Sequence, residues 1–85
     1  MHRNLFDKRI RVQKKHSIEE LSGLEDVLEF LEDWPEHGRD LAFETLHAAC
    51  IRALHRDFPL AAVRHNFERF LARAEMLVDE DQRPA

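Results

Sequence analysis

The feature that most limits the fold of this chain is residues 40–57, DLAFETLHAACIRALHRD, an uninterrupted helix-forming stretch. At about 100° per residue, its apolar side chains share one face, and His47 and Ile51 widen that face on one side. The apolar arc covers roughly 200°, whereas a helix lying on a surface needs a stripe of about 100°. We therefore expect a central helix that other elements cover on two sides. Its apolar face holds Ala42, Phe43, Leu46, Ala49, Cys50, Ala53 and Leu54.

An alternating pattern precedes this helix. Over residues 9–14, Ile10 and Val12 alternate with charged or polar residues, which is the period of a half-buried strand. Residues 15–16 then form a tight turn. A second short strand over 17–21 requires a bulge or an early end, because its two apolar side chains are three residues apart. Together these segments predict a short β-hairpin.

A first helix follows, because Ser22 and Glu25 have the spacing of a capping box, in which the two residues satisfy each other's free backbone donors. We expect it to begin at Gly23 and to be ended by Pro35. One face is apolar and the other is acidic, and we interpret the acids as a solvated face because a convex helix offers no convergent oxygens for a cation. The apolar face holds Leu24, Val27, Leu28, Phe30, Leu31 and Trp34, and the acidic face holds Glu25, Asp26, Glu29, Glu32 and Asp33.

Asp40 is the expected N-cap of the central helix, which should end near Asp57. The Asp57-Phe58-Pro59 break then leads into a third helix over residues 60–75. At the edge of its apolar stripe, Arg64 is placed to pair with an acid of a neighbouring element. The stripe holds Leu60, Val63, Phe67, Phe70, Leu71 and Ala74.

The 85 residues suffice for one domain with a modest core. We expect a flexible lead-in over 1–8, a single compact domain over 9–78 and a disordered tail over 79–85. Residues 76–78 are a short apolar run, either a last helical turn or a strand that joins the hairpin, and we favour the strand. The predicted fold is α+β: a short N-terminal β-hairpin, then three helices with the second packed between the others.

The net charge of −4 is divided unevenly along the chain. Residues 1–16 carry +5, residues 17–40 carry −8, residues 41–78 carry +1 and the remainder carries −2. A basic arm followed by an acidic helix indicates internal or intersubunit charge matching more than nucleic-acid binding. No apolar run approaches the roughly 18 residues of a membrane helix, so we expect no membrane partner. A single cysteine and the lack of a signal-peptide pattern predict a cytoplasmic protein.

Cys50 and the six histidines are the candidates for metal or nucleophilic chemistry. Because Cys50 falls near the middle of the apolar face, we interpret it as a buried structural thiol, with His47 packed at the border of that face. No zinc-binding spacing accompanies these residues, and two glycines cannot build a phosphate-binding loop. We therefore expect no metal, no cofactor and no enzymatic activity.

The second and third helices, joined by a short break, also fit a helix-turn-helix. In that arrangement the third helix would present His65, Asn66, Arg69 and Arg73 to the major groove of DNA. However, the turn has no glycine, and an acidic first helix would repel phosphates. A DNA-binding regulator is therefore the alternative hypothesis, and a nucleic-acid partner is not expected.

Several motifs occur in a distinctive order after the apolar strand. They are F-L-x-x-W-P at Phe30, Leu31, Trp34 and Pro35, then Leu46, Ala49, Cys50, Ala53 and Leu54, then Ala62, Arg64, Phe67 and Phe70, followed by Ala74. Over about residues 6–78 this order resembles the domain-of-unknown-function 982 family of short bacterial proteins. The family usually has a small residue or glycine in the last turn, where this chain has residues 56–59. The resemblance implies no activity, cofactor or catalytic residue.

The leading functional hypothesis is a non-enzymatic protein-interaction or self-association module. It rests on the wide apolar arc of the central helix and on the oppositely charged segments. The expected partner is an unidentified protein or a second copy of the chain, which would give a homo-oligomer. The candidate partner surface consists of His47, Ile51, His65, Asn66, Arg69 and Arg73, and the flank from His47 to Ile51 is the first place to look.

Overall fold

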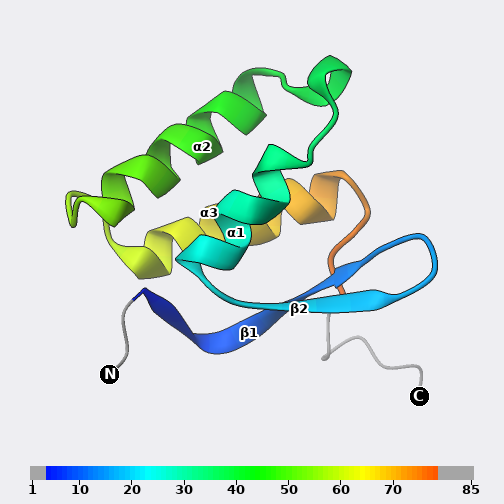
Figure 1. Cartoon of the computed structure of the whole chain (residues 1–85), viewed down its shortest axis with the longest axis horizontal. Coiled ribbons are helices and arrows are strands. Elements are labelled where there is room, and N and C mark those ends of the chain that lie inside the picture. The colour runs from blue at the N-terminus through cyan, green and yellow to red at the C-terminus, as the bar shows by residue number, and fades with distance from the viewer. Residues whose placement is uncertain (1–3, 79–85) are drawn as a thin grey trace.

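A computed structural model describes residues 4–78 and has an α+β fold, as predicted. Two antiparallel strands are followed by three helices (Figure 1). No helix in the described part of the chain is long and apolar enough to cross a membrane. The elements are β1 (Leu5–Gln13), β2 (Ile18–Gly23), α1 (Leu24–Glu32), a 3-10 turn (Glu36–Gly38), α2 (Leu41–Leu54) and α3 (Leu60–Arg73).

The hairpin is longer than predicted. β1 begins at Leu5, four residues before the predicted start of the strand at Arg9, and residues 1–3 of the expected lead-in over 1–8 lie outside the described part. The extra length is held because Leu5 pairs with Gly23, at the far end of β2. Gly23 is needed there, since a Cβ at this position would overlap the backbone carbonyl oxygen of Asn4. That same oxygen accepts a hydrogen bond from the Leu24 amide at 2.8 Å.

The second strand forms without the bulge that its apolar spacing required within 17–21. Ile18 pairs with Gln13 and Leu21 pairs with Ile10 in a regular antiparallel register, and the irregularity lies in β1, between Leu5 and Ile10. Because side chains alternate along a strand, Leu21 is buried whereas Ile18 remains 50% exposed.

The start of α1 differs from the predicted capping box. The helix begins at Leu24 with Gly23 at the N-cap, and no side chain caps it. Ser22 belongs to β2, and its backbone amide donates to the Asp26 carboxylate at 2.8 Å. The predicted capping box of Ser22 and Glu25 is therefore wrong. Because β2 continues to Gly23, the acid that accepts the Ser22 amide is Asp26.

The second helix begins as predicted, because the Asp40 carboxylate accepts a hydrogen bond from the Phe43 amide at 3.0 Å. It ends at Leu54, three residues before the predicted end, and α3 ends at Arg73 rather than Glu75. In both cases the next turn contains a residue with φ near +60°, Arg56 after α2 and Glu75 after α3. This left-handed residue closes a Schellman motif, which stops the helix.

The hydrogen bonds of the two Schellman motifs are complete. After α2, the Asp57 amide donates to Arg52 O at 2.8 Å. After α3, the Met76 amide donates to Leu71 O at the same distance. In each motif the amide of the left-handed residue donates to the carbonyl three residues earlier. Glycine usually takes the left-handed position, so a glycine-based search for helix ends would miss both.

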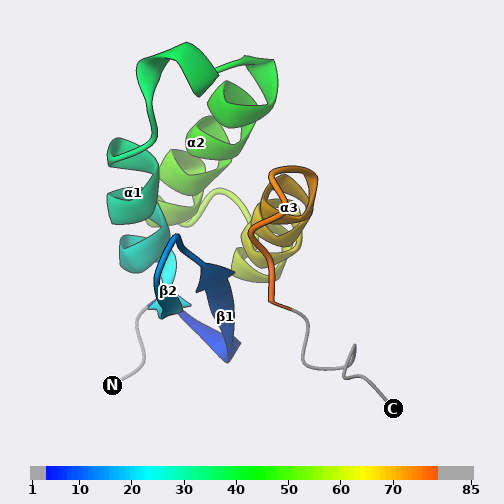
Figure 2. The same ribbon diagram turned by 90° about the vertical axis from the view of Figure 1, so that its right-hand side faces the viewer.

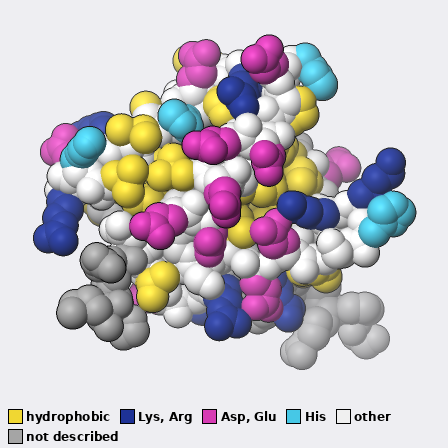
Figure 3. Space-filling view, viewed as in Figure 1, with side chains coloured by type: hydrophobic (Ala, Val, Ile, Leu, Met, Phe, Trp, Pro, Cys, Tyr) yellow, Lys and Arg dark blue, Asp and Glu magenta, His cyan; other side chains and the backbone are white. Residues whose placement is uncertain are grey.

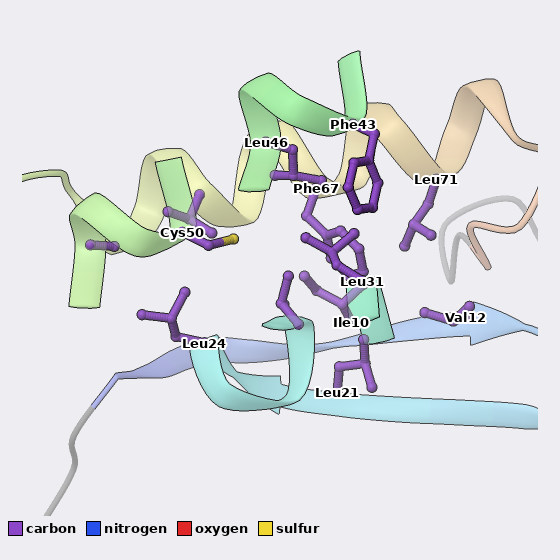
Figure 4. Close-up of a cluster of buried hydrophobic side chains, with 13 residues drawn as sticks. Ile10, Val12, Leu21, Leu24, Leu31, Phe43, Leu46, Cys50, Phe67 and Leu71 are labelled. Carbon is purple, nitrogen blue, oxygen red and sulfur yellow. The ribbon is translucent and has the colours of Figure 1, made fainter. Parts of the chain in front are cut away.

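The core lies where α1, α2, α3 and the hairpin meet (Figures 2 and 4). Phe67 of α3 is fully buried at its centre, and Leu24 of α1 lies opposite Cys50 of α2. α2 packs against both other helices, as predicted. The buried core residues are Ile10, Val12, Leu21, Leu24, Val27, Leu31, Phe43, Leu46, Cys50, Ala53, Val63, Phe67 and Leu71.

α1 covers α2 incompletely. At about 1.5 Å per residue, the nine residues of α1 span about 14 Å, whereas the fourteen residues of α2 span about 21 Å. Leu54, predicted to lie on the buried face, is therefore 39% exposed beyond the start of α1.

Residues 76–78 return to the hairpin after α3, and no strand is formed within them. Leu77 makes a single antiparallel bridge with Val12, flanked by hydrogen bonds from the Gln13 amide to Met76 O and from the Val78 amide to Arg11 O. The strand predicted over 76–78 is therefore reduced to one bridge at Leu77.

Arg64 also differs from the prediction. Its guanidinium pairs with Glu68 of the same helix at 2.7 Å and donates from Nε to the Lys8 carbonyl oxygen at 3.1 Å. The prediction that Arg64 pairs with an acid of a neighbouring element is wrong, because the neighbouring β1 offers a backbone carbonyl oxygen at that position. Arg64 thus ties α3 to the hairpin.

Candidate interaction surface

α2 carries most of the exposed hydrophobic surface. The described residues expose five large hydrophobic side chains, and three of them, Leu41, Ile51 and Leu54, lie on this helix. Leu41 is 77% exposed and the other two are 39% exposed. The remaining two are on the hairpin. α2 therefore exposes large apolar side chains near both of its ends, although it packs on two neighbours.

A groove follows the line where α2 meets α3. Its wider part, with a volume of about 530 Å³, is lined by residues of both helices and by the α2 cap. A second hollow of about 380 Å³ shares two of these residues and extends toward the end of α2. We call this the α2–α3 groove. Its wider part is lined by Asp40, Leu41, Ala42, Thr45, Leu46, Asn66, Arg69, Phe70 and Arg73.

The α2–α3 groove carries positive charge on an apolar floor. Arg69 and Arg73 make no hydrogen bond or ion pair within residues 4–78. Arg52, in contrast, pairs with Asp57 at 3.4 Å. Asp40, the acid that lines the wider part, already accepts the Phe43 amide. The two free guanidinium groups are thus available to an external carboxylate.

The opposite charge gathers on α1. Glu25, Glu29, Glu32 and Asp33 are exposed, and their side chains have no ion pair among the described residues. Figure 3 shows acidic side chains spread over α1, beside a hydrophobic patch over α2. This face is the largest set of unmatched charges in the described part.

The basic N-terminal arm is matched elsewhere. Arg9 and Arg11 pair with Glu20 of β2 at 3.0 and 3.3 Å, and Lys14 pairs with Glu19 at 2.7 Å. The Arg11 and Arg9 guanidinium groups lower the pKa of the Glu20 carboxyl. The internal charge matching expected from the sequence therefore occurs within the hairpin and leaves the acids of α1 unmatched.

The six residues predicted as a partner surface fall on both sides of α2. Asn66, Arg69 and Arg73 line the α2–α3 groove. His65 is exposed on α3 outside the lining of that groove. On the other side, His47 is half-buried, stacks on Phe43 with ring centroids 6.0 Å apart, and lines a hollow between α1 and α2, near the exposed Ile51.

Sequence reasoning missed two contributors to this surface, because Leu41 lies outside the predicted apolar arc and Leu54 is predicted to lie in the core. The acids of α1 are exposed, in agreement with the predicted solvated face. The signal for Leu41 was present, because a leucine on the polar side of an amphipathic helix has no packing reason to be there. The signal for Leu54 was absent, because its exposure depends on the length of a different helix.

Cys50 is fully buried, and this burial raises the pKa of its thiol to about 11. Within residues 4–78, no group of three or more histidine, cysteine, aspartate or glutamate side chains is arranged to hold a metal ion. His47 contacts Phe43 rather than the thiol.

The residues that carry the family resemblance pack in or beside the core. Cys50 and Phe67 are fully buried, and Phe30, Trp34 and Phe70 form a cluster of aromatic rings with centroids 4.9 to 5.7 Å apart. Residues 9–78 match the family model described as "Protein of unknown function (DUF982)". The chain belongs to the DUF982 family. No curated protein and no solved structure matches it.

DUF982 membership assigns no role to the surface. Trp34 donates from Nε1 to the Gly38 carbonyl oxygen at 3.1 Å, and its ring contacts Phe70 of α3. The loop after α1 is thereby fixed against α3, at the end of the molecule where the α2–α3 groove is widest. In this DUF982 chain Trp34 thus supports the groove through Phe70, which also lines its wider part.

Proposed function

We propose that this DUF982 protein is a non-enzymatic protein-interaction module that acts in the cytoplasm and binds its partner through α2. One observation carries the proposal: α2 exposes Leu41, Ile51 and Leu54 although two helices pack against it. Exposing large aliphatic side chains on a small domain costs solubility, and contiguous exposed apolar surface commonly marks interaction sites.

The groove beside Leu41 supports the same function. It offers two free guanidinium groups at its rim and Phe70 and Leu46 at its floor. Apolar contact surrounded by charged groups is the composition of a protein-binding surface, where the apolar part supplies affinity and the charges supply specificity.

The charge of α1 favours this function over DNA binding. Asn66, Arg69 and Arg73, the predicted base-reading side chains, line the α2–α3 groove. The unmatched acids of α1 would repel phosphates.

Affinity capture with a matched control tests the proposal. The full chain is immobilised and exposed to a lysate of the native cell, alongside the double variant Leu41→Ser/Ile51→Ser and the control Ile18→Ser. We expect a protein partner, or the chain itself, to be retained by the wild type and the control and lost by the double variant. Equal retention by all three would contradict the proposal.

Binding to mixed duplex DNA at about 50 mM salt serves as the competing measurement, because nonspecific affinity is largest at low salt. We expect no change in the fluorescence anisotropy of labelled DNA. Binding that is lost in the variant Arg69→Ala/Arg73→Ala would replace the proposed function by the DNA-binding one.

A further inference from the structure

We propose that the partner protein inserts an acidic amphipathic helix into the α2–α3 groove, with aliphatic side chains on the groove floor and two carboxylates against Arg69 and Arg73. The inference rests on the proposed function and specifies the chemistry of the partner. It starts from two guanidinium groups at the edge of an apolar groove, neither of which has a hydrogen-bond or ion-pair partner within residues 4–78.

The α2–α3 groove is long enough for a helix. α2 and α3 lie side by side (Figures 1 and 2), and the two hollows along their junction share Thr45 and Asn66. On α2 the lining runs from Leu41 to Ala49, which is about 12 Å at 1.5 Å per residue. This length accommodates about two turns of a docked helix.

The floor of the groove suits aliphatic side chains. Leu46 and Phe70 form the floor of the wider part, and α2 adds the small side chains of Ala42 and Ala49. Small side chains at a contact allow two helices to approach closely. Leu41 at the rim is 77% exposed, and a helix lying in the groove would remove this apolar surface from water.

The walls of the groove favour a helix over an extended peptide. Both walls are helices, Leu41–Leu54 and Leu60–Arg73, and the backbone groups in the interior of a helix are already paired. An extended segment gains its affinity from backbone hydrogen bonds to a sheet edge, which this groove does not offer. A helix satisfies its own backbone and needs only side-chain contacts.

The two arginines match a pair of acids on such a helix. Arg69 and Arg73 are four residues apart, so they lie on one face of α3 about 6 Å apart along its axis. Two acids four residues apart on a helix aligned with α3 have the same spacing. Each guanidinium can then donate two parallel hydrogen bonds to one carboxylate.

The hollow on the other side of α2 suits an acidic helix less well. It lies between α1 and α2 and is lined by two acids, Glu32 and Glu44. Its arginine, Arg39, already donates to two backbone carbonyl oxygens. Repulsion by these acids directs an acidic segment to the α3 side of α2.

The narrower end of the α2–α3 groove determines where the acids of the partner lie. Glu44 borders that end, and Arg52 beside it is paired with Asp57 at 3.4 Å. Uncompensated positive charge is therefore confined to the wider end, at Arg69 and Arg73. We expect the acids of the partner helix at this end and uncharged side chains at the other.

Selection from a displayed library of random peptides tests the inference, with the full chain as bait. Peptides of about 16 residues provide roughly four helical turns. We expect the enriched sequences to combine aliphatic residues at helical spacing with two acids four residues apart. Arg69→Glu/Arg73→Glu should instead enrich lysine or arginine at those two positions. No enrichment, enrichment without acids, or the same peptides for both baits would overturn the inference.

The affinity for one selected, fluorescently labelled peptide measures the contribution of the two arginines. We expect Arg69→Glu/Arg73→Glu to weaken binding about 100-fold and Arg69→Gln/Arg73→Gln about 10-fold. The control Lys8→Glu/Lys15→Glu makes the same change in net charge at exposed hairpin positions and should bind like the wild type. Circular dichroism checks the folding of every variant, and the glutamine variant tests the contact even if charge reversal disturbs the fold.

Circular dichroism of the mixture tests the helical conformation of the peptide. A free peptide of this length is only marginally helical in water, so binding should add helical signal beyond the sum of the two components. Binding without such a gain would overturn the helical part of the inference.

The outcomes separate this inference from the proposed function. A dimer of the wild-type chain in light scattering that is lost in Arg69→Glu/Arg73→Glu would show a second copy in the groove and overturn the inference. If peptide binding ignores Arg69 and Arg73 while capture from lysate still depends on Leu41 and Ile51, the inference fails and the proposed function stands. If Leu41→Ser/Ile51→Ser affects neither peptide binding nor capture, both fail.

Discussion

Asp26 is the residue that joins β2 to α1, since its carboxylate accepts the Ser22 amide at 2.8 Å. The Ser22 hydroxyl has no such role in the described structure. We expect Asp26→Ala to lower the free energy of unfolding by about 1 kcal/mol, as the loss of a comparable helix-start hydrogen bond does. Ser22→Ala and Glu25→Ala should each change it by less than about 0.5 kcal/mol. Urea denaturation of the three variants measures this. A loss of stability for Ser22→Ala that exceeds the loss for Asp26→Ala would support the predicted capping box instead.

Arg56 has φ near +60°, a conformation that costs a non-glycine residue about 1 kcal/mol or more. We expect Arg56→Gly to raise the free energy of unfolding by about 0.5 to 1 kcal/mol, because glycine adopts this conformation without the steric penalty. Arg56→Ala, which keeps the Cβ, is the matched control and should have little effect. Thermal unfolding distinguishes the two, and a destabilising glycine would contradict the interpretation of this turn.

Cys50 predicts a loss of stability at alkaline pH. Its folded pKa of about 11 lies above its ordinary value of 9.0, because burial disfavours the thiolate. The folded state therefore holds the proton more tightly, and the thiol's contribution is complete below pH 9 and is lost as the pH rises from 9 toward 11. Urea denaturation across this window should show a steeper decline for the wild type than for Cys50→Ala. If stability declines equally in the wild type and in Cys50→Ala, the Cys50 thiol is not the cause of the decline.

At the scale of elements, Leu77 and its two flanking hydrogen bonds hold residues 76–78 against β1. We expect Leu77→Asp to release this segment, because a carboxylate would be placed against the fully buried Val12. Amide hydrogen exchange at Gln13 should then accelerate strongly, while exchange in the centre of α2 changes little. Uniform acceleration would show that the bridge is part of the global unfolding unit.

The length of α1 decides what α2 exposes. α1 has nine residues, and Leu24 at its start lies opposite Cys50 of α2. Leu54, four residues beyond Cys50, is 39% exposed. The sequence pattern of α2 alone indicated one wide apolar face, and only the position of its neighbour divides that face into core and surface.

At the scale of the whole molecule, self-association through α2 would make stability depend on concentration, because association of folded chains stabilises the folded state by mass action. If the partner is a second copy of the chain, we expect the midpoint of thermal unfolding to rise with protein concentration for the wild type and to stay constant for Leu41→Ser/Ile51→Ser. Calorimetry over about a hundredfold range of concentration measures this. A midpoint that is constant for the wild type would contradict self-association.

The pairing of charges could be predicted from the sequence only in part. The segregation of charge predicted internal or intersubunit pairing, and the hairpin accounts for the pairing of Arg9 and Arg11 with Glu20. That the acids of α1 stay unmatched could not be predicted, because pairing depends on which elements become neighbours.

Local patterns in the sequence by themselves determined the α+β class, the three helices, the Asp40 cap and the burial of Cys50. Each depends on contacts within a few residues or on the period of one helix. The tertiary structure alone decided that β1 starts at Leu5, that Asp26 replaces the capping box and that Leu54 is exposed. It also decided that Arg69 and Arg73 border a groove against α2. These features depend on distances between elements far apart in the chain, which no local pattern encodes.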